Sequence, residues 1–178
     1  MGTALPHQTP SLIGCQPSAA SGMNYKLKFW LQASLGSVFF TGYFPIAPAT
    51  VSSFFSLLPA YLLCRKPLLA FFTIVIVFFF GVWLANDLEK VWGKDPKRVT
   101  IDETLGTLIT FFFIPVSWLG LLIGFFLFRA FDILKLPFIN RVQNVRGGWG
   151  VMLDDLLAGI CANLVLRVLG QFFPVLKV

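Results

Sequence analysis

Most acidic residues of this chain lie in or beside apolar stretches, where an ionised carboxylate is energetically unfavourable. Seven of its eight carboxylates border or interrupt stretches that otherwise read as membrane-spanning. Asp102 and Glu103 begin one apolar stretch, Asp132 ends the next, and Asp154 and Asp155 lie inside a third. An ionised carboxylate at membrane depth is unfavourable unless it is paired, metal-bound or facing water. These five are therefore candidate functional residues, although any single one could instead cap a helix at the interface.

The composition indicates that these carboxylates belong to a membrane protein. The chain is 57% hydrophobic and only 12% charged, against about 25% charged in soluble domains. Residues 68–85 carry no charge, and at about 1.5 Å per residue they just span a hydrocarbon core of about 30 Å. The sequence predicts an all-α integral membrane protein. Its expected partners are membrane lipids and not nucleic acid.

The apolar pattern divides the chain into six helical segments. We predict a compact bundle of about five to six short transmembrane or re-entrant helices, at residues 27–40, 51–63, 68–86, 101–114, 117–135 and 150–173. Residues 1–22 are polar and lack the basic and apolar regions of a signal peptide. They are expected to be a disordered extension that precedes one helical domain over residues 23–178.

Pro115 decides the topology of the central part of the chain. Residues 105–128 could form one long helix, but Pro115 removes a helical hydrogen bond near its middle. Two helices that meet at residues 115–117 return Arg129 and Asp132 to the side that holds Asp102. That side then carries eight basic residues against five on the other, which favours a cytoplasmic location for it.

Two helical stripes of polar and small residues accompany the carboxylates. Their members recur at helical spacing and are Glu103, Gly106, Thr107 and Thr110 in one segment and Asp155, Gly159, Asn163 and Arg167 in another. Close packing of helices through small residues would explain the glycines and threonines. It explains the carboxylates less well, because packing alone requires no charge.

Two loops could hold an anion beside these helices. Residues 41–50 end at a predicted helix start, where Thr50, Ser52 and Ser53 offer hydroxyl donors. Residues 146–150 begin with an arginine and contain three glycines, which allow close approach of the backbone to a ligand. Together with carboxylate oxygens, which suit Mg²⁺, these loops indicate a metal ion and a phosphorylated lipid headgroup.

Other phosphatase chemistries fit poorly. The single histidine, His7, lies in the polar tail, so a histidine nucleophile is not expected. Cys161 and Arg167 have Cys-x5-Arg spacing, but the residues between them are apolar and lack the glycines of a phosphate loop. The three cysteines are scattered and predict neither a disulfide framework nor a zinc site.

Several motifs resemble the phosphatidylglycerophosphatase A family over about residues 36–170. They are Thr41-Gly42 through Pro48-Ala49-Thr50, Lys94-Asp95-Pro96, residues 101–106 (IDETLG), residues 128–135 (FRAFDILK) and residues 147–159 (GGWGVMLDDLLAG). The resemblance implies a bacterial inner-membrane, multi-pass, Mg²⁺-dependent enzyme that converts phosphatidylglycerophosphate to phosphatidylglycerol and phosphate. It also implies that the five carboxylates belong to the active centre, with Arg129 and Lys135 nearby.

The chain departs from the family pattern at some loop positions. The family's Pro-Gly-Thr reads Pro48-Ala49-Thr50, its following Gly-Ser reads Ser52-Ser53, its Lys-Pro reads Lys135-Leu136-Pro137, and its His-Gly-Gly reads Arg146-Gly147-Gly148. Without that histidine, no histidine can act as general acid or base here. The carboxylate set is therefore more firmly predicted than the loop geometry.

These arguments assign a role to each candidate residue. The expected metal ligands are Asp102, Glu103, Asp154 and Asp155, with Asp132 a further ligand or a base. The expected substrate-binding residues are Thr41, Thr50, Ser52, Arg129, Lys135 and Arg146. A cation channel or transporter lined by carboxylates is the alternative, and a family member without catalysis is a third possibility that the intact acidic pairs disfavour. The sequence leaves open which acid activates water and how many copies assemble.

Overall fold

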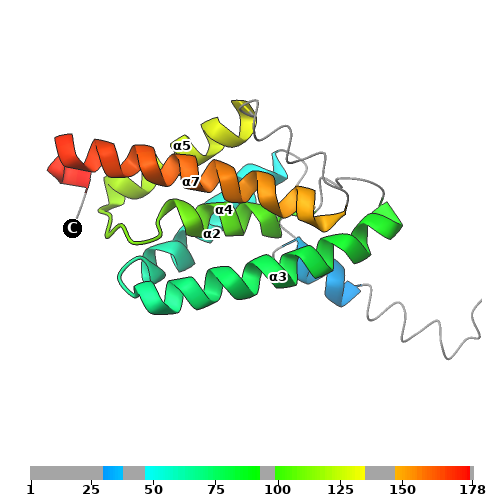
Figure 1. Cartoon of the computed structure of the whole chain (residues 1–178). Helices are drawn as coiled ribbons and strands as arrows, with labels where there is room; N and C mark the ends of the chain where they lie inside the picture. Colours follow the sequence, from blue (N-terminus) through cyan, green and yellow to red (C-terminus); the bar gives the residue numbers. More distant parts are fainter. Residues whose placement is uncertain (1–29, 38–46, 93–98, 135–146, 177–178) are drawn as a thin grey trace, which may run out of the picture.

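A computed structural model describes residues 30–37, 47–92, 99–134 and 147–176 of the chain (Figure 1). These residues form α-helices and no strand, as the sequence predicted. The helices are α2 (Pro48–Leu63), α3 (Pro67–Trp92), α4 (Ile101–Thr110), α5 (Trp118–Leu134), α7 (Gly148–Phe172) and the short 3-10 helix η2 (Pro174–Leu176). Residues 30–36 are also helical. The predicted extension at residues 1–22 lies outside the described part of the chain.

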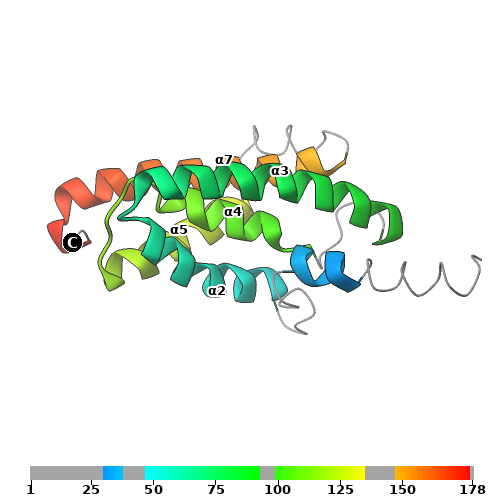
Figure 2. The ribbon, with the colours of Figure 1, turned by 90° about the horizontal axis from the view of Figure 1, so that it is seen from below.

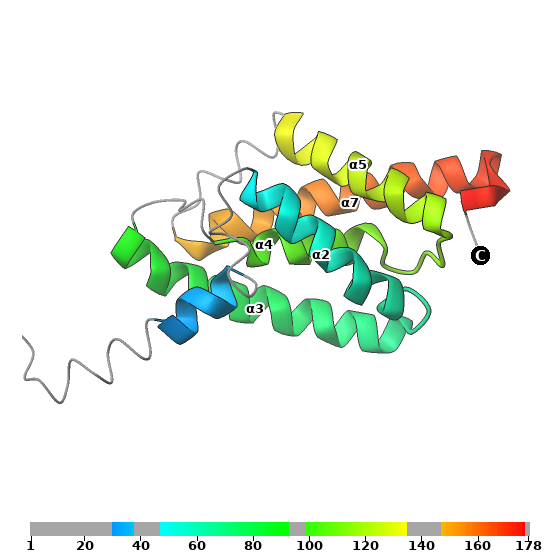
Figure 3. The ribbon, with the colours of Figure 1, turned by 180° about the vertical axis from the view of Figure 1, so that it is seen from behind.

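The shortest of the labelled α-helices lies at the centre of the bundle. Helix α4 packs against α2, α3, α5 and α7 (Figures 1 and 2). The first residues of α2, α4 and α7 and the last residues of α5 lie toward one end of the bundle (Figure 3). The chain thus brings four separate segments to that end, which we call the acidic end because it holds the carboxylates.

Glycines allow α4 and α7 to pack unusually closely. A Cβ atom at position 159 would lie 2.6 Å from the carbonyl oxygen of Gly106, and one at position 106 would lie 3.0 Å from the carbonyl oxygen of Asp155. The hydroxyls of Thr107 and Thr110 bond back to α4 itself, to the carbonyls of Glu103 and Gly106. The two predicted stripes therefore face each other, and their small residues serve packing, as expected.

The rest of the α7 stripe holds the carboxyl end of α4. The Nδ2 atom of Asn163 lies 2.9–3.0 Å from the carbonyl oxygens of Ile109, Thr110 and Phe112. Arg167 donates to the side chain of Asn163 and to the carbonyl of Phe112. Carbonyls at a helix end have no partner within the helix, so this polar pair satisfies them and fixes α4 to α7.

The chain breaks between α4 and α5, as Pro115 predicted. Helix α4 ends at Thr110, four residues before the predicted end at residue 114. Phe111 already leaves the helical conformation, with φ −100° and ψ 5°, and Phe113 is left-handed with φ 60°. Ser117 then anchors the turn to the end of the chain, with its hydroxyl donating to the carbonyl of Val175 at 2.7 Å. The two-helix prediction is confirmed, and α5 runs back toward the acidic end (Figure 3).

Helix α3 presents an apolar surface to its surroundings. Among the described residues, Pro67–Glu89 is the one stretch whose length and hydropathy would allow it to cross a membrane. Its exposed side chains include Leu68, Phe72, Ile76 and Phe79. A contiguous apolar surface of this kind marks a site of interaction with lipid or another protein. Helix α4, at ten residues or about 15 Å, is too short to cross a bilayer.

Candidate active site

Glu103 is the centre of the polar network at the acidic end. It lies in the first turn of α4 and is 7% exposed. The hydroxyl of Ser53, on α2, donates to its Oε2 atom at 2.8 Å. The Nη1 atom of Arg129, on α5, donates to the same oxygen and lies 2.9 Å from Asp132 Oδ2. Glu103 thus joins α2, α4 and α5, and Arg129 links it to a second carboxylate.

The acidic pair of α7 lies beside this network. Asp154 and Asp155 are 7% and 3% exposed, and the backbone N–H of Asp155 donates to Asp154 Oδ1 at 3.0 Å. Asp155 interacts electrostatically with Glu103, Asp102, Asp132 and Asp154. The other four predicted carboxylates therefore lie within electrostatic range of Asp155, although α4, α5 and α7 supply them from positions up to 53 residues apart in the sequence (155 − 102).

This gathering of acids is electrostatically unfavourable by itself. Asp102 begins α4 and accepts the backbone N–H of Glu103 at 3.0 Å. Burial, and after it the neighbouring carboxylates of Glu103 and Asp154, raise the pKa of Asp102 well above its usual range. Like charges disfavour joint ionisation. A bound cation would reverse that effect by favouring the ionised carboxylates.

One buried oxygen also lacks a partner. Asp155 Oδ2 is buried and receives no hydrogen bond from the described residues. An unsatisfied carboxylate oxygen in such a place is expected to bind something, because desolvating it without a partner is costly. The same part of the chain holds no three acidic, histidine or cysteine side chains close enough to make a ready-formed metal site. The donor chemistry fits a hard cation such as Mg²⁺, whereas its coordination geometry is not set in this arrangement.

The predicted substrate-binding residues differ in position and in contacts. Arg129 is at the centre of the network, and Thr50 is half-buried near the start of α2. Ser52 is fully buried, and its hydroxyl donates to the carbonyl of Thr100 at 3.1 Å, where it ties α2 to the start of α4. Its predicted role toward phosphate would require that bond to change. The other three predicted residues, Thr41, Lys135 and Arg146, lie outside the described ranges.

Two residues outside the predicted set also shape the site. Ser53, which the sequence offered only as a loop donor, is the hydroxyl that contacts Glu103. Asn86 of α3 accepts the backbone N–H of Gly148 at 2.8 Å and so holds the first residue of α7. Gly147 precedes it with φ 75°, a conformation in which glycine is favoured. Asn86 thereby fixes the start of the helix that carries Asp154 and Asp155.

The comparisons with known proteins decide the family. Residues 34–170 match the family model described as phosphatidylglycerophosphatase A. The chain belongs to this family. The matched range includes the five carboxylates, Arg129 and both helix stripes, and membership makes the chain a phosphatase, as the sequence motifs predicted. No solved structure shows a significant match.

Curated relatives cover most of the chain. A Bacteroides thetaiotaomicron protein described as "Putative phosphatidylinositol-3-phosphatase" is 36% identical over 148 residues, 78% of this chain and 93% of the relative. Phosphatidylglycerophosphatase A of Escherichia coli is 32% identical over 141 residues, 76% of this chain and 81% of the relative. The Haemophilus influenzae protein of the same name is 38% identical over 94 residues, 51% of this chain and 57% of the relative.

Proposed function

We propose that this phosphatase is Mg²⁺-dependent and hydrolyses phosphatidylglycerophosphate to phosphatidylglycerol and phosphate at the cytoplasmic face of a bacterial inner membrane. The observation that carries the proposal is the gathering of five carboxylates and Arg129 at one end of the bundle. Family membership supports the phosphatidylglycerophosphate substrate. The acids gather at one end instead of following a path through the bundle, which gives no support to the channel alternative.

The carboxylates would hold the metal. Asp102, Glu103, Asp154 and Asp155 are the proposed ligands, and Asp132 is a further ligand or the base. Mg²⁺ at this position would neutralise phosphate charge and lower the pKa of bound water. Asp155 Oδ2, which is buried and without a partner among the described residues, is the oxygen best suited to bind it.

Arg129 would hold the phosphate. Its guanidinium already lies between Glu103 and Asp132, and its buried Nε atom has no hydrogen-bond partner in the described part of the chain. A guanidinium can offer two parallel donors to a phosphate. Thr50 and Ser52, with Thr41, Lys135 and Arg146 from outside the described residues, are the proposed further donors. Hydrolysis would break the terminal P–O ester bond, with water supplying oxygen to phosphorus and a proton reaching the departing alcohol.

The same arrangement supports the proposed multi-pass position in the membrane. Helix α3 is long and apolar enough to cross, and large apolar side chains are exposed on α2, α5 and α7 as well. The basic loops predicted beside the acidic end favour the cytoplasmic side. The acidic end would then meet the phosphate of a lipid whose chains remain in the bilayer.

The test is phosphate release by the detergent-purified full chain, first with Mg²⁺ and then with EDTA. We expect release from phosphatidylglycerophosphate that EDTA abolishes, and a loss of about 10²-fold or more in Asp102→Asn and Asp155→Asn. Asp87→Asn is the matched control, because Asp87 accepts a hydrogen bond from Gln32 and is not part of the cluster. Activity like that of the unmodified protein in both cluster variants would refute the site assignment.

The name of the Bacteroides thetaiotaomicron relative provides a second substrate for the assay. This name refers to a phosphatase of phosphatidylinositol 3-phosphate, and the match spans 93% of the relative's length. Both lipids end in a phosphomonoester, so the same carboxylate chemistry would serve either. We therefore include phosphatidylinositol 3-phosphate in the assay. A higher kcat/KM for that lipid would overturn the substrate proposal and leave the phosphatase assignment intact.

A further inference from the structure

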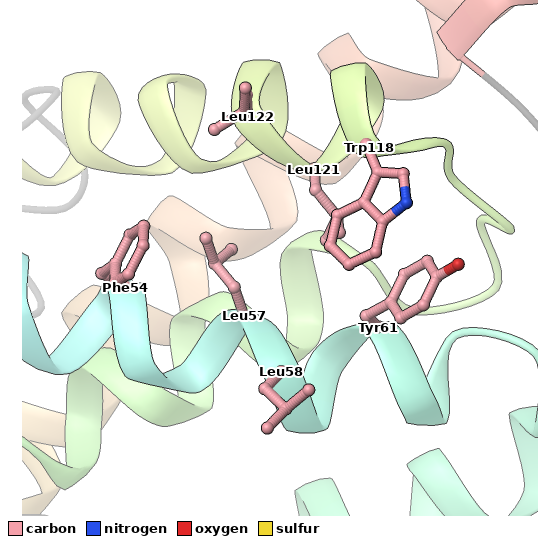
Figure 4. A pocket seen from close by; sticks show the side chains of 7 residues that line it. All are labelled: Phe54, Leu57, Leu58, Tyr61, Trp118, Leu121 and Leu122. Atoms are coloured by element: carbon pink, nitrogen blue, oxygen red, sulfur yellow. The ribbon is translucent and has the colours of Figure 1, made fainter.

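An apolar groove runs between α2 and α5, away from the acidic end. It has a volume of about 310 Å³ and is lined by Phe54, Leu57, Leu58, Tyr61, Trp118, Leu121 and Leu122 (Figure 4). Leu57 and Leu121 are 9% and 3% exposed and belong to the core. Phe54, Leu58, Trp118 and Leu122 are largely exposed. Packed proteins rarely leave a space this large unfilled, so an apolar occupant is expected.

The groove lies on the two helices that also carry Ser53 and Arg129. Helices α2 and α5 are antiparallel neighbours, and their facing residues meet at successive turns. Phe54 contacts Phe125 edge to face, with ring centroids 6.3 Å apart, and Tyr61 stacks on Trp118 at 4.9 Å. The same register, continued one turn toward the acidic end, places Thr50 level with Arg129. Polar side chains therefore give way to apolar ones along a single pair of helices.

A stacked aromatic pair, Tyr61 and Trp118, lines the far end of the groove. Figure 4 shows Phe54 at one end of the groove and the stacked Tyr61 and Trp118 at the other, with Leu57 and Leu121 between them. From Phe54 to Tyr61 the helix rises about 10 Å. Apart from the tyrosine hydroxyl and the indole N–H, the lining side chains carry no polar group. The groove can thus accept a hydrocarbon chain but offers almost nothing to a polar ligand.

We propose that this groove binds one acyl chain of the phospholipid substrate while its phosphate lies at Arg129. The proposal rests on the proposed function, because it takes the substrate to be a phospholipid. It assigns α2 and α5 a second role. Arg129 on α5 and Ser53 on α2 belong to the acidic end, whereas residues 54–61 of α2 and 118–122 of α5 form the chain site. Selectivity for long-chain over short-chain substrate then originates in this groove.

The test compares long-chain and short-chain substrate. The full chain is assayed with dioleoyl and with dihexanoyl phosphatidylglycerophosphate, and the ratio of their kcat/KM values is measured. Leu58→Trp and Leu122→Trp fill the groove and are expected to lower that ratio about tenfold, which corresponds to about 1.4 kcal/mol. Leu62→Trp and Phe126→Trp are the matched controls, because these residues are exposed on the same helices but do not line the groove. An unchanged ratio in the groove variants would overturn the proposal.

A binding measurement separates this proposal from the proposed function. Trp118 lines the groove, so phosphatidylglycerophosphate with brominated acyl chains should quench the fluorescence of the unmodified chain more than that of Trp118→Phe, which keeps the other four tryptophans. Equal quenching by brominated phosphatidylcholine would identify a surrounding lipid and refute the assignment. A change of oligomeric state in the groove variants, without a change in the substrate ratio, would identify a contact between copies. Substrate-selective quenching without phosphate release would support the groove and contradict the proposed activity.

Discussion

The close approach of α4 and α7 predicts a large functional effect for a single methyl group. In Gly159→Ala the new Cβ atom would lie 2.6 Å from the carbonyl oxygen of Gly106, whereas ordinary contacts begin at 3.4 Å. The two helices must therefore separate by about 0.8 Å (3.4 − 2.6). Alanine favours a helix over glycine by about 1 kcal/mol, and overpacking costs about 1–3 kcal/mol. The net loss in the free energy of unfolding is then at most about 2 kcal/mol.

The effect on activity should exceed the effect on stability. Asp155 lies four residues before Gly159, and Glu103 lies three residues before Gly106. Separating the backbones therefore moves the carboxylates of α7 away from those of α4. A misplacement of about 1 Å can cost about 10²-fold in rate. We expect kcat for phosphate release to fall between about tenfold and 10²-fold, while the thermal unfolding midpoint falls only slightly.

The assay measures kcat at saturating lipid together with thermal unfolding in the same detergent. Ile160→Ala is the control on the same helix, because this neighbouring side chain is 40% exposed. Its kcat should stay within about twofold, since surface changes away from such contacts have small effects. A folded Gly159→Ala variant with unchanged kcat would refute the argument that this crossing sets the distance between the carboxylates.

Three further changes test the surroundings of the site. Ser53→Ala removes a donor to buried Glu103 and should lower kcat/KM about tenfold, whereas Ser56→Ala, whose hydroxyl contacts Thr104 instead, should not. Asn86→Leu removes the acceptor of the Gly148 N–H and should reduce the free energy of unfolding by about 1–3 kcal/mol, measured in denaturant. Because the pKa of Asp102 is raised in the fold, the metal-free chain should lose stability as pH rises from the ordinary carboxyl range toward that raised pKa. Melting midpoints at about pH 5 and about pH 8 should differ in EDTA and converge with Mg²⁺, and equal midpoints in EDTA would contradict the argument.

The sequence predicted those features that depend on local periodicity or on a single strong residue. Pro115 predicted the break between two helices, and α4 and α5 are indeed separate. The four-residue spacing of Asp155, Gly159 and Asn163 predicted that they share one face of a helix, and that face packs on α4. The return of Arg129 to the side of Glu103 followed from the break at Pro115, and the ion pair between the two residues confirms it.

Features that depend on contacts between distant parts of the chain could not be predicted from the sequence. Ser53 and Glu103 are 50 residues apart, and nothing local distinguishes Ser53 from Ser52 and Ser56, which bond elsewhere. From the sequence alone, Asn86 is only a polar residue near the end of an apolar helix. Its role as acceptor of the Gly148 N–H depends on where Gly148 lies in the fold. The early end of α4 at Thr110 is followed by a left-handed Phe113. A phenylalanine seldom adopts this conformation, and the neighbouring residues do not predict it.

The way α7 holds α4 explains how so short a helix can carry a site. Asn163 and Arg167 fix its carboxyl end, and Gly106 and Gly159 fix its middle by direct backbone contact. Its first turn, with Asp102 and Glu103, is then held at a fixed position beside Asp155, although the helix itself is short. Catalytic groups must be held within about 0.5 Å of their working positions. A ten-residue helix achieves this because α7 constrains its middle and carboxyl end while α2 and α5 hold its first turn at Glu103, so changes at the far end of α4 should reach the carboxylates as well.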